Sequence, residues 1–206
     1  MAKDKPKPTE DGIVFDSDEE LDFHYFLKDC ALYGLVEDIV YQPEQYELTS
    51  KATRQIWKTF KSKPPEPRSR HMFHPHVYTA DWSIVWTSKF FEVFPHAPLL
   101  LVDATDRQSR EILDLQFCTK QGIFRGWGIV DVKGAYNAHG GDRLFPVHQK
   151  WMWDKFGIPL TKIIPQEFFQ KLGAVPNKVK WIKNRKKPTP KKAYQTLPTI
   201  DQIFST

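Results

Sequence analysis

The stretch that decides how the chain is interpreted ends in Ile129-Val130-Asp131-Val132-Lys133. Apolar and aromatic residues dominate positions 123–132 and predict a β-strand that stops at Gly134. Residues two apart in a strand project from the same face. Asp131 and Lys133 are therefore expected to point together, with Val132 turned toward the core on the other side.

The surrounding sequence predicts an α/β domain. Ser17 followed by Glu20 has the spacing of a capping box, apolar residues then recur at helical intervals, and Gly34 is a natural stop. Further strands are expected at 36–41, 46–48, 77–86, 99–103 and 161–164, and helices at 106–117, 146–156 and 165–172. Residues 51–70 are basic and are interpreted as a loop or mobile insertion. This order predicts a mixed central β-sheet flanked by helices.

Length and composition are those of one intracellular domain. The chain has 206 residues, 40% of them hydrophobic, which is enough for one sizeable core. We expect disorder over residues 1–12, the α/β domain over 13–172 and a basic tail over 173–206. The sequence contains no apolar stretch long enough to cross a bilayer and no signal peptide, and Cys30 and Cys118 are expected to stay reduced. These features predict a soluble, cytoplasmic protein without a membrane partner.

The charge distribution favours a polyanionic partner. The net charge is +5, and no acidic residue lies between Glu167 and Asp201. A solvated basic tail is the alternative interpretation, although Trp181 and Tyr194 lie among the charges and could stack on bases. The candidate phosphate contacts are Lys178, Lys180, Lys183, Arg185, Lys186 and Lys187 in this segment, and Lys150 on the preceding helix.

Asp131 and Lys133 are the candidate reactive pair. A carboxylate that holds a divalent metal and an ammonium that positions water or stabilises phosphate charge suit phosphodiester hydrolysis. The triplet alone is expected by chance roughly once in a chain of this size, and a surface salt bridge would explain it equally. Asp81 adds weight, because it is a lone acid in an aromatic strand and is costly to bury unless it is paired or binds a metal.

Together these motifs resemble the PD-(D/E)XK nuclease superfamily. An acid at Glu20 on the first helix is followed by Tyr78-Thr79-Ala80-Asp81-Trp82 and by Asp131-Val132-Lys133-Gly134. The likeness covers about residues 15–165 and is greatest to phage-borne junction-resolving and recombination endonucleases. It implies a restriction-endonuclease-like core and a DNA-cleaving activity.

The resemblance also implies roles for individual residues. Asp81 and Asp131 would be metal-binding carboxylates, with the main-chain carbonyl of Val132 as a further ligand. Lys133 would be the catalytic lysine, and Glu20 would orient water or a second metal. Ligation by oxygen alone suits Mg²⁺ or Mn²⁺.

Several alternatives stay open at this level. The Ser17 capping box explains Glu20 without chemistry, and Glu19 or Asp22 could take its place. Because 49 residues separate Asp81 from Asp131, Asp103 or Asp106 could be the true partner of Asp131.

Two functions from different classes compete. One is a metal-dependent endonuclease acting on DNA, in particular on branched or recombination intermediates, where paired incisions would call for a homodimer. The other is a non-catalytic DNA-binding or regulatory protein built on a nuclease fold.

Overall fold

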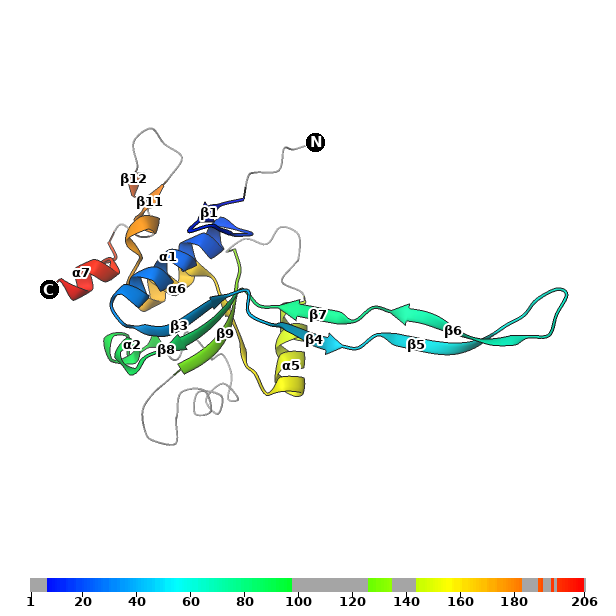
Figure 1. Cartoon of the computed structure of the whole chain (residues 1–206). Helices are drawn as coiled ribbons and strands as arrows, with labels where there is room; N and C mark the ends of the chain where they lie inside the picture. Colours follow the sequence, from blue (N-terminus) through cyan, green and yellow to red (C-terminus); the bar gives the residue numbers. More distant parts are fainter. Residues whose placement is uncertain are drawn as a thin grey trace.

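The computed structural model describes residues 7–97, 126–134, 144–182, 189–190, 194 and 196–205. Its central sheet contains the strands β3 (Val36–Tyr41), β8 (Trp82–Trp86), β9 (Gly126–Val132) and β10 (Leu160–Ile163). They lie in the order β10-β9-β8-β3, with β9 parallel to β10 and antiparallel to β8 (Figure 1). The predicted mixed α/β architecture is therefore confirmed.

Helices cover both faces of β9. Val130 and Val132 lie in one hydrophobic cluster with α1 (Asp18–Leu32) and α6 (Pro165–Leu172). Ile129 lies in a second cluster with α5 (Phe145–Phe156). Successive strand residues point to opposite faces, so Asp131 has the orientation of Ile129 and faces the α5 side of the sheet.

Helix α1 begins and ends as its sequence predicts. The Ser17 hydroxyl accepts a hydrogen bond from the Glu20 amide at 3.1 Å, and Gly34 follows the helix with a φ of +66°. Phe26 on its inner face packs edge-on against Phe168 of α6, with the ring centroids 5.5 Å apart. The cap fixes the start of the helix, and the aromatic contacts fix its position over the sheet.

The N-terminal segment is folded where the structure describes it. The sequence predicts disorder over residues 1–12, but β1 (Thr9–Glu10) and β2 (Ile13–Val14) form a short antiparallel hairpin. The Phe15 amide closes this hairpin with a hydrogen bond to the Pro8 carbonyl at 2.9 Å. Sequence gives little sign of this element because its strands are only two residues long.

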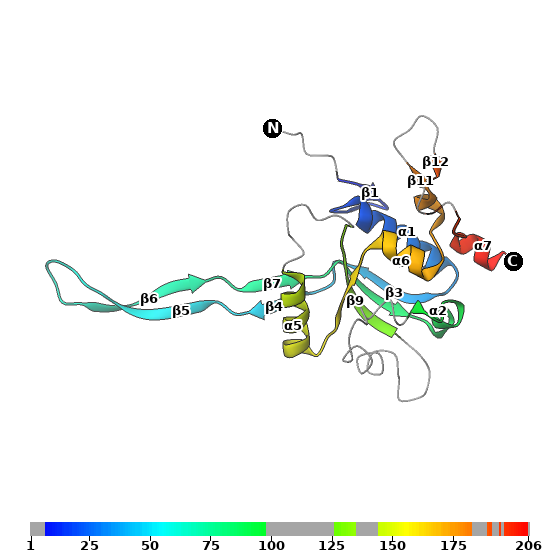
Figure 2. The same ribbon diagram turned by 180° about the vertical axis from the view of Figure 1, so that it is seen from behind.

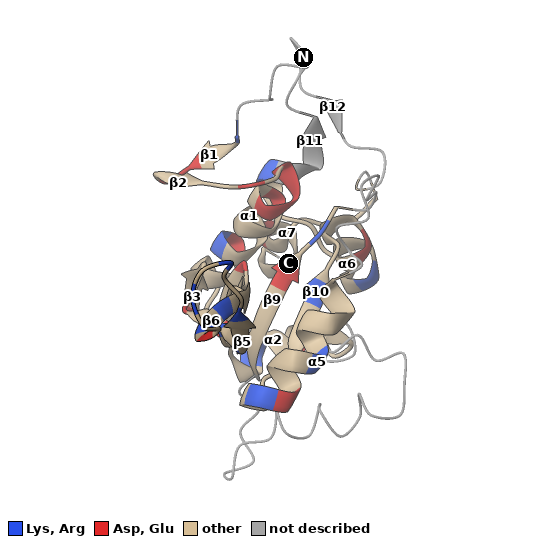
Figure 3. Cartoon of the chain, turned by 90° about the vertical axis from the view of Figure 1, so that its right-hand side faces the viewer, with Lys and Arg blue, Asp and Glu red and all other residues tan. Residues whose placement is uncertain are grey.

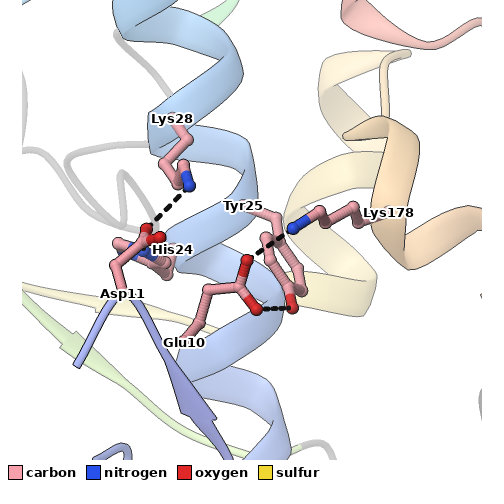
Figure 4. Close-up of polar contacts among 6 residues, drawn as sticks. All are labelled: Glu10, Asp11, His24, Tyr25, Lys28 and Lys178. Atoms are coloured by element: carbon pink, nitrogen blue, oxygen red, sulfur yellow. Dashed lines mark hydrogen bonds and ion pairs between the residues drawn. The ribbon is translucent and has the colours of Figure 1, made fainter. Parts of the chain in front are cut away.

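Two acids of the hairpin hold it against the body (Figure 4). Glu10 accepts a hydrogen bond from the Tyr25 hydroxyl at 2.9 Å and forms an ion pair with Lys178. Asp11 forms an ion pair with Lys28 at 2.7 Å. The segment after α6 is thereby tied to the N-terminus.

The predicted basic tail over 173–206 is anchored in the core at both ends of its described part. Ala174, Val175 and Ile200 are fully buried in the α1 cluster, and Val175 forms a β-bridge with Thr199. The abundance of lysine in this segment conceals the few apolar residues that anchor it. Its elements are a 3-10 helix, η2 (Asn177–Lys180), the strands β11 (Trp181–Ile182) and β12 (Thr189–Pro190), and the helix α7 (Ile200–Phe204).

The predicted loop at 51–70 is instead part of a long β-ribbon. After β3, the strands β4 (Gln45–Thr49) and β5 (Ala52–Lys58) run outward, and β6 (Glu66–Phe73) and β7 (His76–Thr79) return. Figures 1 and 2 show the ribbon projecting from the body. The single strand predicted at 77–86 is accordingly two strands, since β7 belongs to the ribbon and β8 to the central sheet.

Two predicted elements lie outside the described residues. These are the strand at 99–103 and the helix at 106–117; before them, α2 (Ser88–Val93) follows β8. In the part of the chain that is described, no helix is long and apolar enough to cross a membrane.

Burial of Ile200 predicts that the C-terminal segment contributes to stability. Ile200→Ala should lower the free energy of unfolding by about 2–5 kcal/mol, because it leaves a cavity among core side chains. Urea unfolding followed by circular dichroism measures the change. Leu32→Ala is the control, since Leu32 is 74% exposed and its loss should change stability by less than about 0.5 kcal/mol. Equal effects of the two substitutions would contradict the assignment of Ile200 to the core.

Candidate active site

Asp131 and Lys133 lie together at the carboxyl end of β9. The Lys133 Nζ is 2.8 Å from the Asp131 Oδ2, and the Asp131 side chain is 5% exposed whereas that of Lys133 is 31% exposed. Val132 between them is buried in the α1 cluster. The predicted arrangement of a co-facial acid and lysine with an inward valine is confirmed.

Asp81 lies beside this pair, in the break between β7 and β8. Its Oδ2 accepts a hydrogen bond from the Val132 amide at 2.6 Å. Its own amide donates to the Val130 carbonyl at 3.1 Å, and its carbonyl accepts from the Gln42 amide at 2.8 Å. Asp81 thus uses both backbone and side chain to bind β9 and the end of β3.

Glu20 approaches the same region from the first turn of α1. It is 5% exposed, and its Oε2 accepts hydrogen bonds from the Tyr41 hydroxyl at 3.0 Å and from the Asp16 amide at 3.1 Å. Its negative charge contributes to the raised pKa of Asp81. Figure 3 shows acidic residues both at the end of β9 and at the start of α1.

The two alternatives to Glu20 face elsewhere. Glu19 and Asp22 are half-buried, and their charges, together with burial, raise the pKa of Tyr194. Tyr194 belongs to the C-terminal segment and packs on Phe169 of α6. Of the three acids, Glu20 is therefore the one directed toward Asp81.

The site carries excess negative charge. Burial and the neighbouring charge of Asp131 raise the pKa of Asp81 from its ordinary 3.8 to about 8, although the Val132 hydrogen bond opposes this shift. Burial alone would lower the pKa of Lys133, but the ion pair with Asp131 raises it above its ordinary value. Within the described residues, Lys133 is the one cation that forms an ion pair with this group of Glu20, Asp81 and Asp131.

The donor atoms fit a hard divalent cation. Asp81, Asp131 and the main-chain carbonyl of Val132 offer oxygen ligands, which Mg²⁺ and Mn²⁺ prefer. Among the described residues, no three acidic, histidine or cysteine side chains form a group that could hold a metal ion. A metal held by the two carboxylates would depend on water, main chain or a substrate phosphate for its other ligands, which is common for Mg²⁺.

Three aromatic residues near the site are missed by sequence analysis. The Tyr78 hydroxyl is buried, and burial and the charges of Asp131 and Asp81 raise its pKa. The His148 ring of α5 packs 4.7 Å from the Tyr78 ring, and its Nε2 lies 3.0 Å from that of His76. Tyr78 was detectable as the residue three before Asp81, whereas the meeting of His76 with His148 depends on tertiary structure.

The other predicted site residues are placed as follows. Lys150 is exposed on α5, and Lys178 is engaged with Glu10 (Figure 4). Asp103 and Asp106 lie outside the described residues, as do Lys183, Arg185, Lys186 and Lys187, and only the backbone of Lys180 is described. Their roles as alternative ligands or phosphate contacts stay predictions.

No protein-family model, curated protein or solved structure matches the chain. Its function therefore has to be inferred from the site itself.

The raised pKa of Asp81 predicts a pH-dependent stability. Because this pKa is about 8 in the folded chain and 3.8 is its ordinary value, folding retains a proton that the unfolded chain has lost between these pH values. The free energy of unfolding should fall as pH rises from about 4 to 8, an effect that Asp81→Asn removes. The variant should be more stable near pH 8 by on the order of a few kcal/mol, since one pKa unit is worth about 1.4 kcal/mol.

Urea unfolding of both proteins in chelator, from pH 4 to pH 8.5, tests this prediction. Asparagine keeps an acceptor for the Val132 amide, so the two proteins should agree near pH 4. Parallel pH dependences across the whole range would show that Asp81 is not held protonated.

Proposed function

We propose that this chain is a metal-dependent endonuclease that hydrolyses phosphodiester bonds in DNA. The observation that carries the proposal is the hydrogen bond between Asp81 and β9. The Asp81 carboxylate accepts this bond from the Val132 amide. Val132 lies between Asp131 and Lys133, whose side chains form an ion pair with 2.8 Å between Oδ2 and Nζ. One buried carboxylate (Asp131), one half-buried carboxylate (Asp81) and one lysine near a strand end suit metal-assisted cleavage of a phosphodiester.

Asp81, Asp131 and the Val132 carbonyl would hold Mg²⁺ or Mn²⁺. When bound, such an ion would supply Lewis acidity for phosphodiester hydrolysis. Clustered acids at the site support this role, because burial raises the pKa of Asp81 first and the charge of Asp131 raises it further, and a divalent cation would relieve that second contribution.

Lys133 and Glu20 would complete the site from the protein side. An ammonium has three donors, and the contact with Asp131 leaves Lys133 able to bind a phosphate oxygen and stabilise its charge. Glu20 is oriented by Tyr41 and by the Ser17 cap, so its carboxylate is positioned to accept a hydrogen bond from an attacking water. These are the roles that the resemblance to the PD-(D/E)XK superfamily implies. On the same resemblance, we propose that the core is restriction-endonuclease-like.

The proposed substrate is DNA, with branched or recombination intermediates as the preferred form. Support comes from the net charge of +5 and from basic side chains such as Lys150, which is exposed on α5. Cleavage of a four-way junction requires two incisions, so this form of the proposal includes a homodimer.

Asp131→Asn should abolish cleavage while leaving DNA affinity equal or slightly higher. The substitution removes a proposed metal ligand, and we expect cleavage to slow by about 10³-fold or more. It also removes a negative charge close to the bound phosphate. Labelled junction, flap, duplex and single-stranded DNA, incubated with Mg²⁺, Mn²⁺ or chelator, measure cleavage, and gel shifts in chelator measure affinity.

Asp154→Asn is the matched control. Asp154 is an exposed carboxylate on α5, so this variant changes the net charge equally and should keep wild-type cleavage. If the wild-type protein leaves every substrate intact in both metals yet binds DNA, the non-catalytic DNA-binding alternative replaces the nuclease proposal.

A further inference from the structure

The outer part of the ribbon, formed by β5 and β6, carries its charges on one face. Arg54 lies directly opposite Arg70, Lys58 lies opposite Glu66, and Arg68 lies between these two pairs. Directly opposed residues of antiparallel strands share a face. Arg54, Lys58, Arg68 and Arg70 therefore form one surface, which we call the cationic face.

The opposite face of β5 and β6 carries no arginine, lysine or acid, and its one ionisable side chain is His71, which lies opposite Thr53. Gln55 lies opposite Ser69, and Trp57 lies opposite Pro67. The Trp57 side chain is 71% exposed. The arginines and lysine of β5 and β6 thus lie on one face of the ribbon, although both faces are exposed to solvent.

Folding alone does not explain the cationic face. Two arginines directly opposite each other destabilise a strand pair, and within the described residues no carboxylate forms an ion pair with Arg54 or Arg70. A two-stranded ribbon without a hydrophobic face is marginally stable in water. A bound polyanion would neutralise these opposed arginines, so their repulsion is consistent with a surface that binds one.

This element carries a strong excess of base over acid. Residues 51–73 contain seven Lys and Arg and a single acid, Glu66, whereas the whole chain has a net charge of only +5. The remainder of the chain is consequently slightly acidic. Figure 3, which looks along the ribbon, shows blue Lys and Arg segments on β5 and β6.

We propose that this ribbon is a DNA-binding arm whose cationic face contacts the sugar–phosphate backbone of duplex DNA. The choice of DNA as the polyanion rests on the proposed function. A two-stranded β-ribbon has the width of the major groove, and alternate residues on one face are roughly 6.7 Å apart. Guanidinium groups at this spacing can each bind a phosphate through two N–H donors.

A second anionic surface, the lipid bilayer, fits the arm less well. Binding at a membrane interface requires apolar side chains to enter the lipid while basic ones meet the headgroups. The face opposite the arginines carries Gln55 and Ser69 beside the exposed Trp57, so it lacks the continuous apolar surface that would enter the lipid. Phe60 at the turn is covered by Lys63 and Arg68, which lie 4.6 and 5.5 Å from its ring.

The arm is joined directly to the candidate active site. β7 ends at Thr79, two residues before Asp81. β6 alone spans roughly 26 Å at 3.3 Å per residue. DNA bound to the arm would be tethered to the site while contacting the protein well beyond the acidic cluster.

Duplex binding by a triple variant tests the arm. A labelled 30-base-pair duplex is titrated with wild-type protein and with Arg54→Gln/Arg68→Gln/Arg70→Gln in chelator, at several salt concentrations. Loss of three phosphate contacts should weaken binding by about 10- to 100-fold near 0.1 M salt and lower the slope of log K against log salt by about 2–3. The corresponding triple lysine variant should keep most of the affinity and the slope, because it preserves charge.

A control variant carries Lys89→Gln/Lys155→Gln/Lys171→Gln, which removes three cations from exposed positions on α2, α5 and α6. Its affinity should stay within about threefold of wild type, and all variants should melt as the wild type does. An unchanged affinity and salt slope in the arginine-to-glutamine variant would overturn the proposal. An equal loss of duplex affinity in the control variant would also overturn it. Binding of the same variants to vesicles of phosphatidylserine and phosphatidylcholine is measured alongside, and a loss of binding seen with these vesicles but not with the duplex would overturn it as well.

Cleavage by the wild-type protein is measured separately in Mg²⁺. Metal-dependent cleavage combined with unaffected duplex binding by the arginine-to-glutamine variant would remove the arm and leave the nuclease proposal standing. Arm-dependent duplex binding without cleavage in either metal would support the arm and remove the nuclease proposal.

Discussion

The contact between the Asp81 carboxylate and the Val132 amide, at 2.6 Å, is the constraint on which the site depends. At this residue the chain leaves the ribbon and enters the central sheet. Its backbone is bound on one side to Val130 and on the other to Gln42. One aspartate therefore fixes the root of the ribbon, the start of β8 and the end of β9, and any ligand held by Asp81 is held by a rigid part of the fold.

This arrangement has an electrostatic cost that folding alone does not recover. Burying carboxylates near one another is unfavourable unless cations or hydrogen bonds compensate them. Lys133, the Val132 amide and the Tyr41 hydroxyl supply part of that compensation, and the pKa of Asp81 is nevertheless raised. Such a residual imbalance is typical of sites that bind a charged ligand. The body and the ribbon are opposite in this respect, since the body concentrates acid where the ribbon concentrates base.

Sequence predicted the elements in which local pattern and burial agree. The Ser17 cap and the apolar period of α1 were sufficient, and the two-residue period of β9 correctly paired Asp131 with Lys133. The ribbon was missed because both of its faces are largely exposed to solvent. For that reason the sequences of β5 and β6 do not alternate between apolar and polar residues. The C-terminal anchor was missed because Val175 and Ile200 lie at the two ends of a lysine-rich stretch. The approach of Tyr41 to Glu20 and of His148 to His76 is created by packing, which one-dimensional spacing does not encode.

The ribbon also changes how the sheet can assemble. β3 and β8 are neighbours in the sheet, yet 40 residues separate Tyr41 from Trp82. Closing a flexible loop of that length costs about 2 kcal/mol more than closing one of five residues. Once β4 to β7 have paired, only a few residues at the root still separate the two strands, so they can meet almost as the arms of a tight hairpin do. The projecting element is therefore a spacer that evolution can lengthen or shorten by pairs of residues without disturbing the register of the body.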